Sequence, residues 1–349
     1  MKQQFLKWAK RLGLFALARR LTAQRLRILC YHGAWIADGP VYGSYLFMSP
    51  DRFARRMALL RRLGYPVLPL GDAVRHLLAG TLPPGATAIT IDDGWYGTYA
   101  HMLPVLKAQG LPATIYVTTH YVVKERPVLN ILVGHMLQRA APGPYPWAEI
   151  ATDGAENGAF RLDTPGMRSR VAETIWARLD MLPDVDARHA EVRRLAAIFG
   201  YDMARAENAR WFDLMRAGEV RDAEAQGFDI QLHTHRHRQY GFDAERVAGE
   251  IAENRRLLAD ITGRAPQDFT HFCYPSGNWS DSLFPVLQKL GIESATTTDS
   301  GLNARDAEPL ALRRILDGES LTDLDFEARL CGFWDLVEAI KNRKGGRGR

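Results

Sequence analysis

The sequence predicts an α/β protein, an incomplete (β/α)7 TIM-like barrel that carries a helical insertion. Strand-like segments recur along the chain at residues 27–31, 86–91, 113–118, 228–232, 269–274, 294–298 and 310–315. Helical patterns separate most of these segments, and strands that alternate with helices form parallel sheets through right-handed crossovers. About seven such units suit a barrel whose functional side chains gather at the C-terminal ends of its strands.

The helices expected between the strands follow sequence signals. One begins at Ser49-Pro50-Asp51, where Ser can cap the helix and Pro suits the first helical position. Others are expected at 101–109, 243–261 and 280–290. From 122 to 223 no convincing strand is found and helical patterns dominate, which is too long for a crossover. We interpret this stretch as an insertion, either a decoration or a lid over the functional site.

The charge of the chain is concentrated at its two ends. The formal net charge is +5, and residues 1–37 contain eight Lys or Arg and no Asp or Glu. The last nine residues, 341–349, add five basic residues, and between the ends the charges roughly cancel. This distribution argues against a nucleic-acid groove, so no nucleic-acid partner is expected.

Residues 1–25 predict a single basic amphipathic helix. Phe5, Trp8, Leu12 and Phe15 recur at helical spacing, and most basic residues fall elsewhere around the helix. Such a helix either lies on an anionic membrane surface or packs on its own domain, and the sequence leaves both alternatives open. The basic C-terminal segment is a second candidate for the same membrane surface.

The termini and the cysteines predict a cytoplasmic protein, with a peripheral position at the inner membrane face as an open alternative. No apolar run approaches the roughly 18 residues needed to span a bilayer. Arg19 and Arg20 interrupt the short apolar stretch near the N-terminus, which makes it a poor signal peptide. Three cysteines at distant positions form no pair pattern, so buried, inert thiols in a reducing compartment are expected.

Two acidic residues end a predicted strand in Thr90-Ile91-Asp92-Asp93-Gly94. Neighbouring side chains of a strand point to opposite faces, so both carboxylates share a pocket only if the strand ends there. Gly94 permits the turn that this requires. A cation can then bind one carboxylate while the other remains free as a base. Taken alone, however, Asp-Asp-Gly is a common turn sequence.

A histidine cluster follows the predicted strand at 228–232. His233 and His237 are four residues apart, so one helical turn would place both imidazoles on the same side, with His235 pointing away. Two neutral imidazoles and one carboxylate leave metal positions open for water and substrate. Three histidines in five residues are hard to explain as packing.

Two further strand ends carry candidate residues. Phe272-Cys273-Tyr274-Pro275-Ser276-Gly277 leaves its strand through a turn, where a backbone N–H can donate to a developing oxyanion. Leu29-Cys30-Tyr31-His32-Gly33 places a histidine at the end of the first strand. Each is an ordinary strand exit when taken alone, and His32 matters only if its strand end faces the metal.

Together these segments resemble the polysaccharide deacetylase family of carbohydrate esterases, which has the NodB-like fold. The resemblance implies that Asp92 is the catalytic base and that Asp93, His233 and His237 bind the metal, Zn²⁺ with Co²⁺ or Ni²⁺ as alternatives. It also implies that the backbone N–H of Tyr274 stabilises the oxyanion.

The chain departs from the commonest pattern of the family. The resemblance covers residues 27–120 and 211–330, but no His follows His271 where the family usually has its acid. Tyr31-His32 near the N-terminus is similar to a permuted subgroup typified by biofilm poly-N-acetylglucosamine deacetylases. The usual Arg of the third motif is also missing, and Arg314 resembles its substitute in that subgroup.

This reading predicts a deacetylase-like domain at 26–330, with the insertion at 122–223, flanked by the helix at 1–25 and by a basic helix and tail at 331–349. The expected reaction is hydrolysis of the N-acetyl group of an amino sugar in a glycan or lipid-linked saccharide. Asp92 would accept a proton from the attacking water and His32 would protonate the leaving amine. Two alternatives stay open, namely a deformylase of a lipid-linked sugar and a catalytically silent glycan-binding or membrane-docked scaffold.

Overall fold

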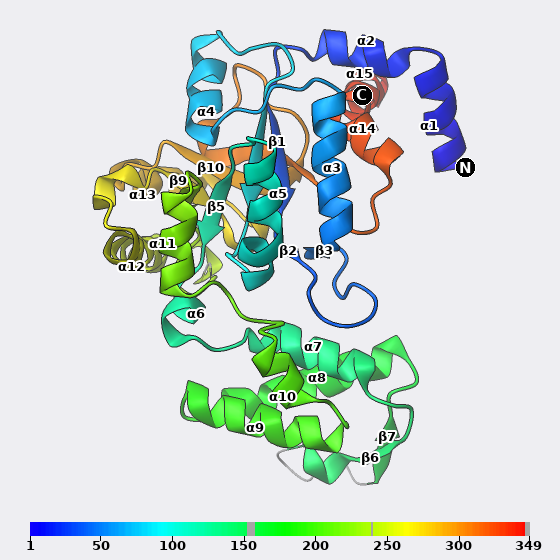
Figure 1. Ribbon diagram of the computed structural model, residues 1–349, viewed down its shortest axis with the longest axis vertical. Coiled ribbons are helices and arrows are strands. Elements are labelled where there is room, and N and C mark those ends of the chain that lie inside the picture. The colour runs from blue at the N-terminus through cyan, green and yellow to red at the C-terminus, as the bar shows by residue number, and fades with distance from the viewer. Residues whose placement is uncertain (152–157, 239, 346–349) are drawn as a thin grey trace. The chain divides into compact units, whose positions relative to one another are not determined.

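The computed structural model describes residues 1–151, 158–238 and 240–345, with side chains up to residue 341. It divides into two compact units, Met1–Glu125 with Leu214–Arg349 and Arg126–Asp213. The first unit contains the barrel (Figure 1).

Seven parallel strands form a closed barrel, which confirms the predicted fold class. Each strand pairs with its neighbour in chain order, and the first also pairs with the last to close the ring. The strands are β1 (Arg27–Tyr31), β4 (Thr87–Ile91), β5 (Thr114–Val117), β8 (Asp229–Leu232), β9 (His271–Cys273), β10 (Ser294–Ser300) and β11 (Leu312–Leu316). Each lies within or overlaps one of the seven predicted segments. Most of their residues are buried, as expected of parallel strands that are covered on both faces.

Helices surround the barrel, and all but the last of those named here lie between successive barrel strands in the chain (Figure 1). They are α3 (Pro50–Arg62), α4 (Leu70–Ala79), α5 (Leu103–Ala108), α6 (Thr119–Lys124), α11 (Ala217–Ala225), α12 (Ala244–Thr262), α13 (Phe284–Lys289) and α14 (Asp323–Leu330). A small parallel pair, β2 (Gly33–Ala34) and β3 (Phe47–Met48), follows β1. Ser49 precedes α3 as expected, but its backbone N–H and hydroxyl donate to the Glu319 carboxylate, so its side chain does not cap the helix.

The second unit corresponds to the predicted insertion but is shorter than 122–223. It contains α7 (Leu129–Arg139), α8 (Pro165–Asp180), α9 (Val185–Ile198) and α10 (Met203–Asn208). Contrary to the strand-free expectation, β6 (Pro144–Pro146) and β7 (Ala159–Arg161) form an antiparallel pair. Aromatic packing holds this pair, with the Trp147 and Phe160 ring centroids 4.5 Å apart. A role of this unit as a lid stays a prediction.

The N-terminal segment forms two helices where the sequence predicted one. α1 (Lys2–Arg11) and α2 (Leu14–Leu21) are separated at Gly13, whose φ of 75° interrupts the helix. A left-handed conformation is accessible to glycine because it lacks a Cβ atom. The last helix, α15 (Phe333–Gly345), lies in the expected basic C-terminal segment, and residues 346–349 of that segment lie outside the described residues. Among the described helices, none is long and apolar enough to cross a membrane.

Candidate active site

The predicted site residues converge at the C-terminal ends of the barrel strands. His32 follows β1, Asp92 and Asp93 follow β4, and His233 follows β8. Parallel strands bring these ends to one face of a barrel, which is why residues far apart in the sequence meet there.

Asp93, His233 and His237 form the first cluster. Asp93 Oδ1 lies 3.2 Å from His233 Nε2 and 3.5 Å from His237 Nε2. One potential ligand atom from each residue lies within 4.8 Å of the others. A carboxylate oxygen and two imidazole nitrogens at this spacing fit the donor set of a Zn²⁺-type cation.

The loop conformation around the histidines differs from the prediction. Residues 233–237 form no helical turn, and Thr234 and His237 have left-handed φ angles of 63° and 54°. The irregular loop nevertheless brings the His233 and His237 ring centroids to 4.8 Å. His235 is buried, with Nδ1 3.0 Å from the Thr119 hydroxyl. Thr119, which provides this hydroxyl, lies more than a hundred residues earlier in the chain.

Neighbouring groups fix the orientation of the cluster. The Trp95 indole N–H donates to Asp93 Oδ2 at 2.8 Å and leaves Oδ1 to face the histidines. His233 Nδ1 lies 2.8 Å from the Cys273 carbonyl, which can only accept, so Nδ1 carries a proton and Nε2 is directed at Asp93. Such outer hydrogen bonds are typical of metal-ligating histidines.

The electrostatics favour an ionised Asp93 and a neutral His237, the forms in which these side chains can bind a metal ion. Burial opposes ionisation of Asp93, but the hydrogen bond from His233 and the nearby His237 and His32 outweigh it, so the pKa of Asp93 lies well below its usual range. Burial, together with His233, lowers the pKa of His237 to about 4. His237 is therefore neutral near pH 7, the form in which imidazole binds metals.

A buried ion pair forms the second part of the site. Arg314 donates from its two terminal nitrogens to the two oxygens of Asp92, at 2.7 and 2.8 Å. Arg314 also donates to the Thr297 carbonyl at 2.7 Å, and both charged side chains are almost fully buried. Burial by itself raises the pKa of Asp92, but Arg314 outweighs it and lowers that pKa to about 2. The two Arg314 hydrogen bonds hold the Asp92 carboxylate in place.

His32 lies beside this pair. Its Nε2 is 3.7 Å from Asp92 Oδ2, and its side chain is 19% exposed whereas that of Asp92 is 3% exposed. The imidazole therefore lies on the solvent side of the carboxylate, where a substrate can reach it.

The expectation for Tyr274 does not hold in this structure. Its backbone N–H donates to the Thr296 carbonyl at 3.2 Å, and its hydroxyl donates to the Leu310 carbonyl at 2.8 Å. Pro275 has no N–H to offer. The next residue with a backbone N–H is Ser276, which is exposed and has a φ of 55°. The turn thus offers an N–H from Ser276 and not from Tyr274.

Two cysteines belong to the site although no role in it was predicted for them. Asp92 Oδ2 lies 3.5 Å from Cys273 Sγ and 3.7 Å from Cys30 Sγ, and Arg314 also contacts Cys273 at 3.3 Å. Both thiols are buried, as expected, and burial raises the pKa of Cys30 well above its usual value. A signal was available for Cys273, because it precedes Tyr274 in the motif from which the usual Arg is missing.

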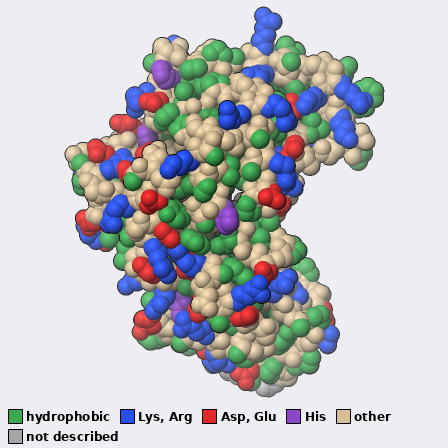
Figure 2. Space-filling view, in the orientation of Figure 1, with side chains coloured by type: hydrophobic (Ala, Val, Ile, Leu, Met, Phe, Trp, Pro, Cys, Tyr) green, Lys and Arg blue, Asp and Glu red, His purple; other side chains and the backbone are tan. Residues whose placement is uncertain are grey.

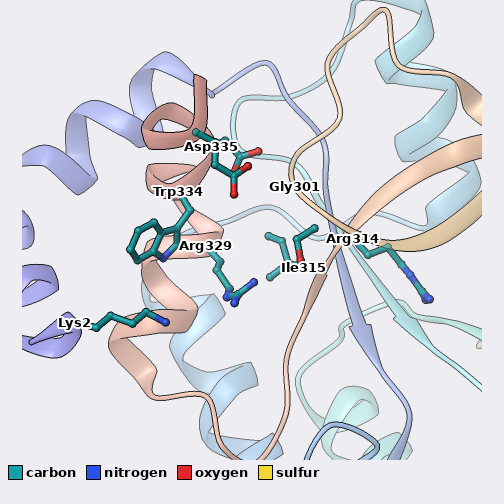
Figure 3. A pocket seen from close by; sticks show the side chains of 9 residues that line it. Lys2, Gly301, Arg314, Ile315, Arg329, Trp334 and Asp335 are labelled. Atoms are coloured by element: carbon teal, nitrogen blue, oxygen red, sulfur yellow. The ribbon is translucent and has the colours of Figure 1, made fainter. Parts of the chain in front are cut away.

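Two hollows lie on the first unit. One, of about 530 Å³, adjoins the Gly277 turn and is lined by Gly241, Phe242, Gly277, Asn278, Trp279 and Asp299. The other, of about 350 Å³, is lined in part by Lys2, Trp334 and Asp335 (Figure 3). The Arg314 side chain points away from this second hollow, toward Asp92, so the hollow is separate from the site (Figure 3).

Comparison with known proteins agrees with this geometry. The family model described as polysaccharide deacetylase matches residues 79–179 and 196–295, more than half of the chain. No curated protein sequence matches this chain. The fold is similar to that of the Streptococcus pyogenes deacetylase PplD in complex with acetate, at 16% identity over 88% of this chain and 98% of that chain, with a TM-score of 0.56. It is also similar to IcaB from Ammonifex degensii, at 18% identity over 88% and 97% of the two chains, with a TM-score of 0.52. The chain belongs to the polysaccharide deacetylase family.

Proposed function

We propose that this protein is a metal-dependent N-deacetylase that hydrolyses the acetamide of an amino sugar in a glycan or lipid-linked saccharide. The observation that carries the proposal is the juxtaposition of two clusters. The donor set of Asp93, His233 and His237 adjoins the Asp92–Arg314 pair, with His32 beside it.

The donor set suits a divalent cation that keeps open coordination positions. Asp93, His233 and His237 would hold it, and two nitrogens with one carboxylate oxygen favour Zn²⁺, with Co²⁺ or Ni²⁺ as alternatives. When bound, such a cation polarises the amide carbonyl and lowers the pKa of water.

The side chains of the chain itself supply the proton transfers. Asp92, kept ionised by Arg314, accepts the proton of the attacking water, and His32 donates a proton to the departing amine. The Ser276 N–H is the backbone donor that remains for the developing oxyanion. The products are acetate and a free amino sugar.

The hollow next to the Gly277 turn supports a glycan as the substrate. Its lining combines the aromatic side chains of Phe242 and Trp279 with the polar side chains of Asn278 and Asp299. Ligand sites typically combine apolar and aromatic walls with a few placed polar groups.

We expect the purified, metal-loaded protein to release acetate from β-linked N-acetylglucosamine oligosaccharides. Mass spectrometry of the sugar before and after incubation would show the loss of acetyl groups, and an enzymatic acetate assay would count them. N-formyl oligosaccharides serve as the parallel substrate. Release of formate alone would favour the deformylase alternative. Unchanged glycans that still bind would indicate a silent scaffold.

We expect His32→Ala to lower turnover about a hundredfold while metal stays bound, because a general acid contributes on this scale. The test compares kcat with metal content measured by atomic emission. His101→Ala, at an exposed histidine of the π-helical segment Thr98–Met102 outside the cluster, serves as the control. Near-normal turnover in metal-loaded His32→Ala protein would refute the assignment.

A further inference from the structure

The two N-terminal helices each have one face packed on the protein. Their inward residues join a single apolar cluster with α14, Cys331 and α15. The buried members of this cluster are Leu6, Ala9, Phe15, Ala18, Ala328, Cys331 and Phe333. Ion pairs from Lys2 to Asp325 and from Lys10 to Glu327 hold α1 on α14. This packing places the helices firmly on the barrel unit.

The outward faces of the same helices are apolar and exposed to solvent. Trp8 is 61% exposed, Leu12 70% and Leu21 61%. The exposed apolar side chains recur three and seven residues apart along each helix. They are Phe5 and Trp8 in α1 with Leu12 at its C-terminal cap, and Leu14, Leu17 and Leu21 in α2. We call these six residues the apolar face. Contiguous exposed apolar surface of this kind is typical of interaction sites.

Unpaired cations flank the apolar face. Lys7, Arg11 and Arg20 are exposed, and within the described part of the chain no carboxylate pairs with them. The first acidic residue in the sequence is Asp38. Figure 2 shows hydrophobic and basic side chains side by side over α1 and α2. Apolar residues next to free positive charge complement a surface that is negative outside and apolar beneath.

We propose that the apolar face docks this protein on an anionic lipid bilayer. The six apolar side chains enter the boundary between headgroups and acyl chains, while Lys7, Arg11 and Arg20 bind lipid phosphates. Trp8 suits this boundary because indole combines an apolar ring with a polar N–H. The sequence left membrane docking and packing on the domain as alternatives, but α1 and α2 have a separate face for each.

Charge favours a bilayer over a second copy of the chain. A two-fold dimer would place the apolar face of one copy against the same face of the other. Lys7, Arg11 and Arg20 would then lie near their own equivalents, with no carboxylate from α1 or α2 to compensate. Anionic lipid supplies the opposite charge without this repulsion.

The test is cosedimentation of the full chain with vesicles. We expect binding to vesicles of phosphatidylglycerol and phosphatidylcholine, little binding to phosphatidylcholine alone, and weaker binding as salt is raised. Replacing Lys7, Arg11 and Arg20 by Gln should weaken binding about fivefold for each charge, or roughly a hundredfold in all.

Matched variants distinguish docking through the apolar face from nonspecific adsorption to the vesicles. Leu12→Ser combined with Trp8→Ser should abolish binding, because both side chains belong to the apolar face. Met181→Ser is the control, since Met181 is 72% exposed but lies outside α1 and α2. All replaced side chains are exposed, so circular dichroism and thermal unfolding should stay unchanged.

Three outcomes would overturn the proposal. The first is absence of binding by the unaltered chain, and the second is equal binding by the Trp8/Leu12 and Met181 variants. The third is a dimer of the unaltered chain in light scattering that the Trp8/Leu12 variant does not form, when neither protein binds vesicles. Acetate release from soluble oligosaccharides is measured without vesicles, so failure of docking and failure of the deacetylase proposal remain distinguishable.

Discussion

Removal of bound metal is expected to abolish amide hydrolysis, and added Zn²⁺ or Co²⁺ should restore it. Asp93→Ala and His233→Ala should behave like the chelated protein, because each deletes one donor of a three-donor set. Metal content measured by atomic emission and acetate release measured in parallel check this expectation. Full activity of metal-free protein would exclude the proposed chemistry.

Asp92→Asn is the matched comparison for these ligand variants. Asp92 is adjacent to Asp93 but its oxygens bind Arg314, so the amide should leave the metal donors in place. Turnover should nevertheless fall by about 10²–10⁴-fold, the contribution of a positioned general base. Loss of metal together with activity would instead show that Asp92 is a ligand.

We expect Arg314→Met to have the largest effect on stability. Removing one partner of a buried ion pair leaves the other charge uncompensated and costs about 3–5 kcal/mol. Arg314 and Asp92 form such a pair. Urea unfolding at neutral pH would measure the loss. Arg313→Met is the control, since the neighbouring side chain is exposed and its replacement should cost within about 0.5 kcal/mol.

The pH dependence of the same variant tests the role of Arg314 in the reaction. In the unaltered protein the pKa of Asp92 is lowered from 3.8 to about 2, so its contribution to stability is complete above about pH 4 and is lost as the pH falls toward 2. Without the guanidinium, burial dominates and raises the pKa of Asp92. The acid limb of the activity profile should therefore move to higher pH. If the acid limb of the activity profile did not move, Arg314 would have only a structural role.

The barrel was predictable because its signals are local. Each strand is a short apolar run that ends in polar or turn-forming residues, and the alternation with helices fixes the parallel arrangement. That arrangement alone brings His32 to Asp92 across 60 residues of sequence. The break at Gly13 and the strand pair β6–β7 were missed. A single glycine does not reveal its φ angle, and β6–β7 depends on aromatic contacts that form only in the folded unit.

The details of the site depend on contacts that the sequence does not display. The left-handed residues near His235 occur in a loop anchored by the Glu250 carbonyl and the Thr119 hydroxyl, which lie on other elements. The N–H of Tyr274 is occupied because β9 and β10 pair in one particular register. The sequence motifs therefore identified which residues meet in the site. The tertiary contacts determine which of their atoms remain free to bind a ligand.

The position of α2 has a consequence for which sugars the protein can reach. Arg27 at the start of β1 binds the Thr22 carbonyl just after α2, whereas His32 follows the opposite end of that strand. Figure 1 shows α2 and β2 at opposite ends of the barrel. α3, which runs alongside with 13 residues, spans about 20 Å. In a molecule docked through the apolar face, the reacting groups would lie about that far from the headgroups that α2 contacts. Such a molecule would then leave sugars next to a lipid anchor unmodified and deacetylate sugars farther out along the glycan.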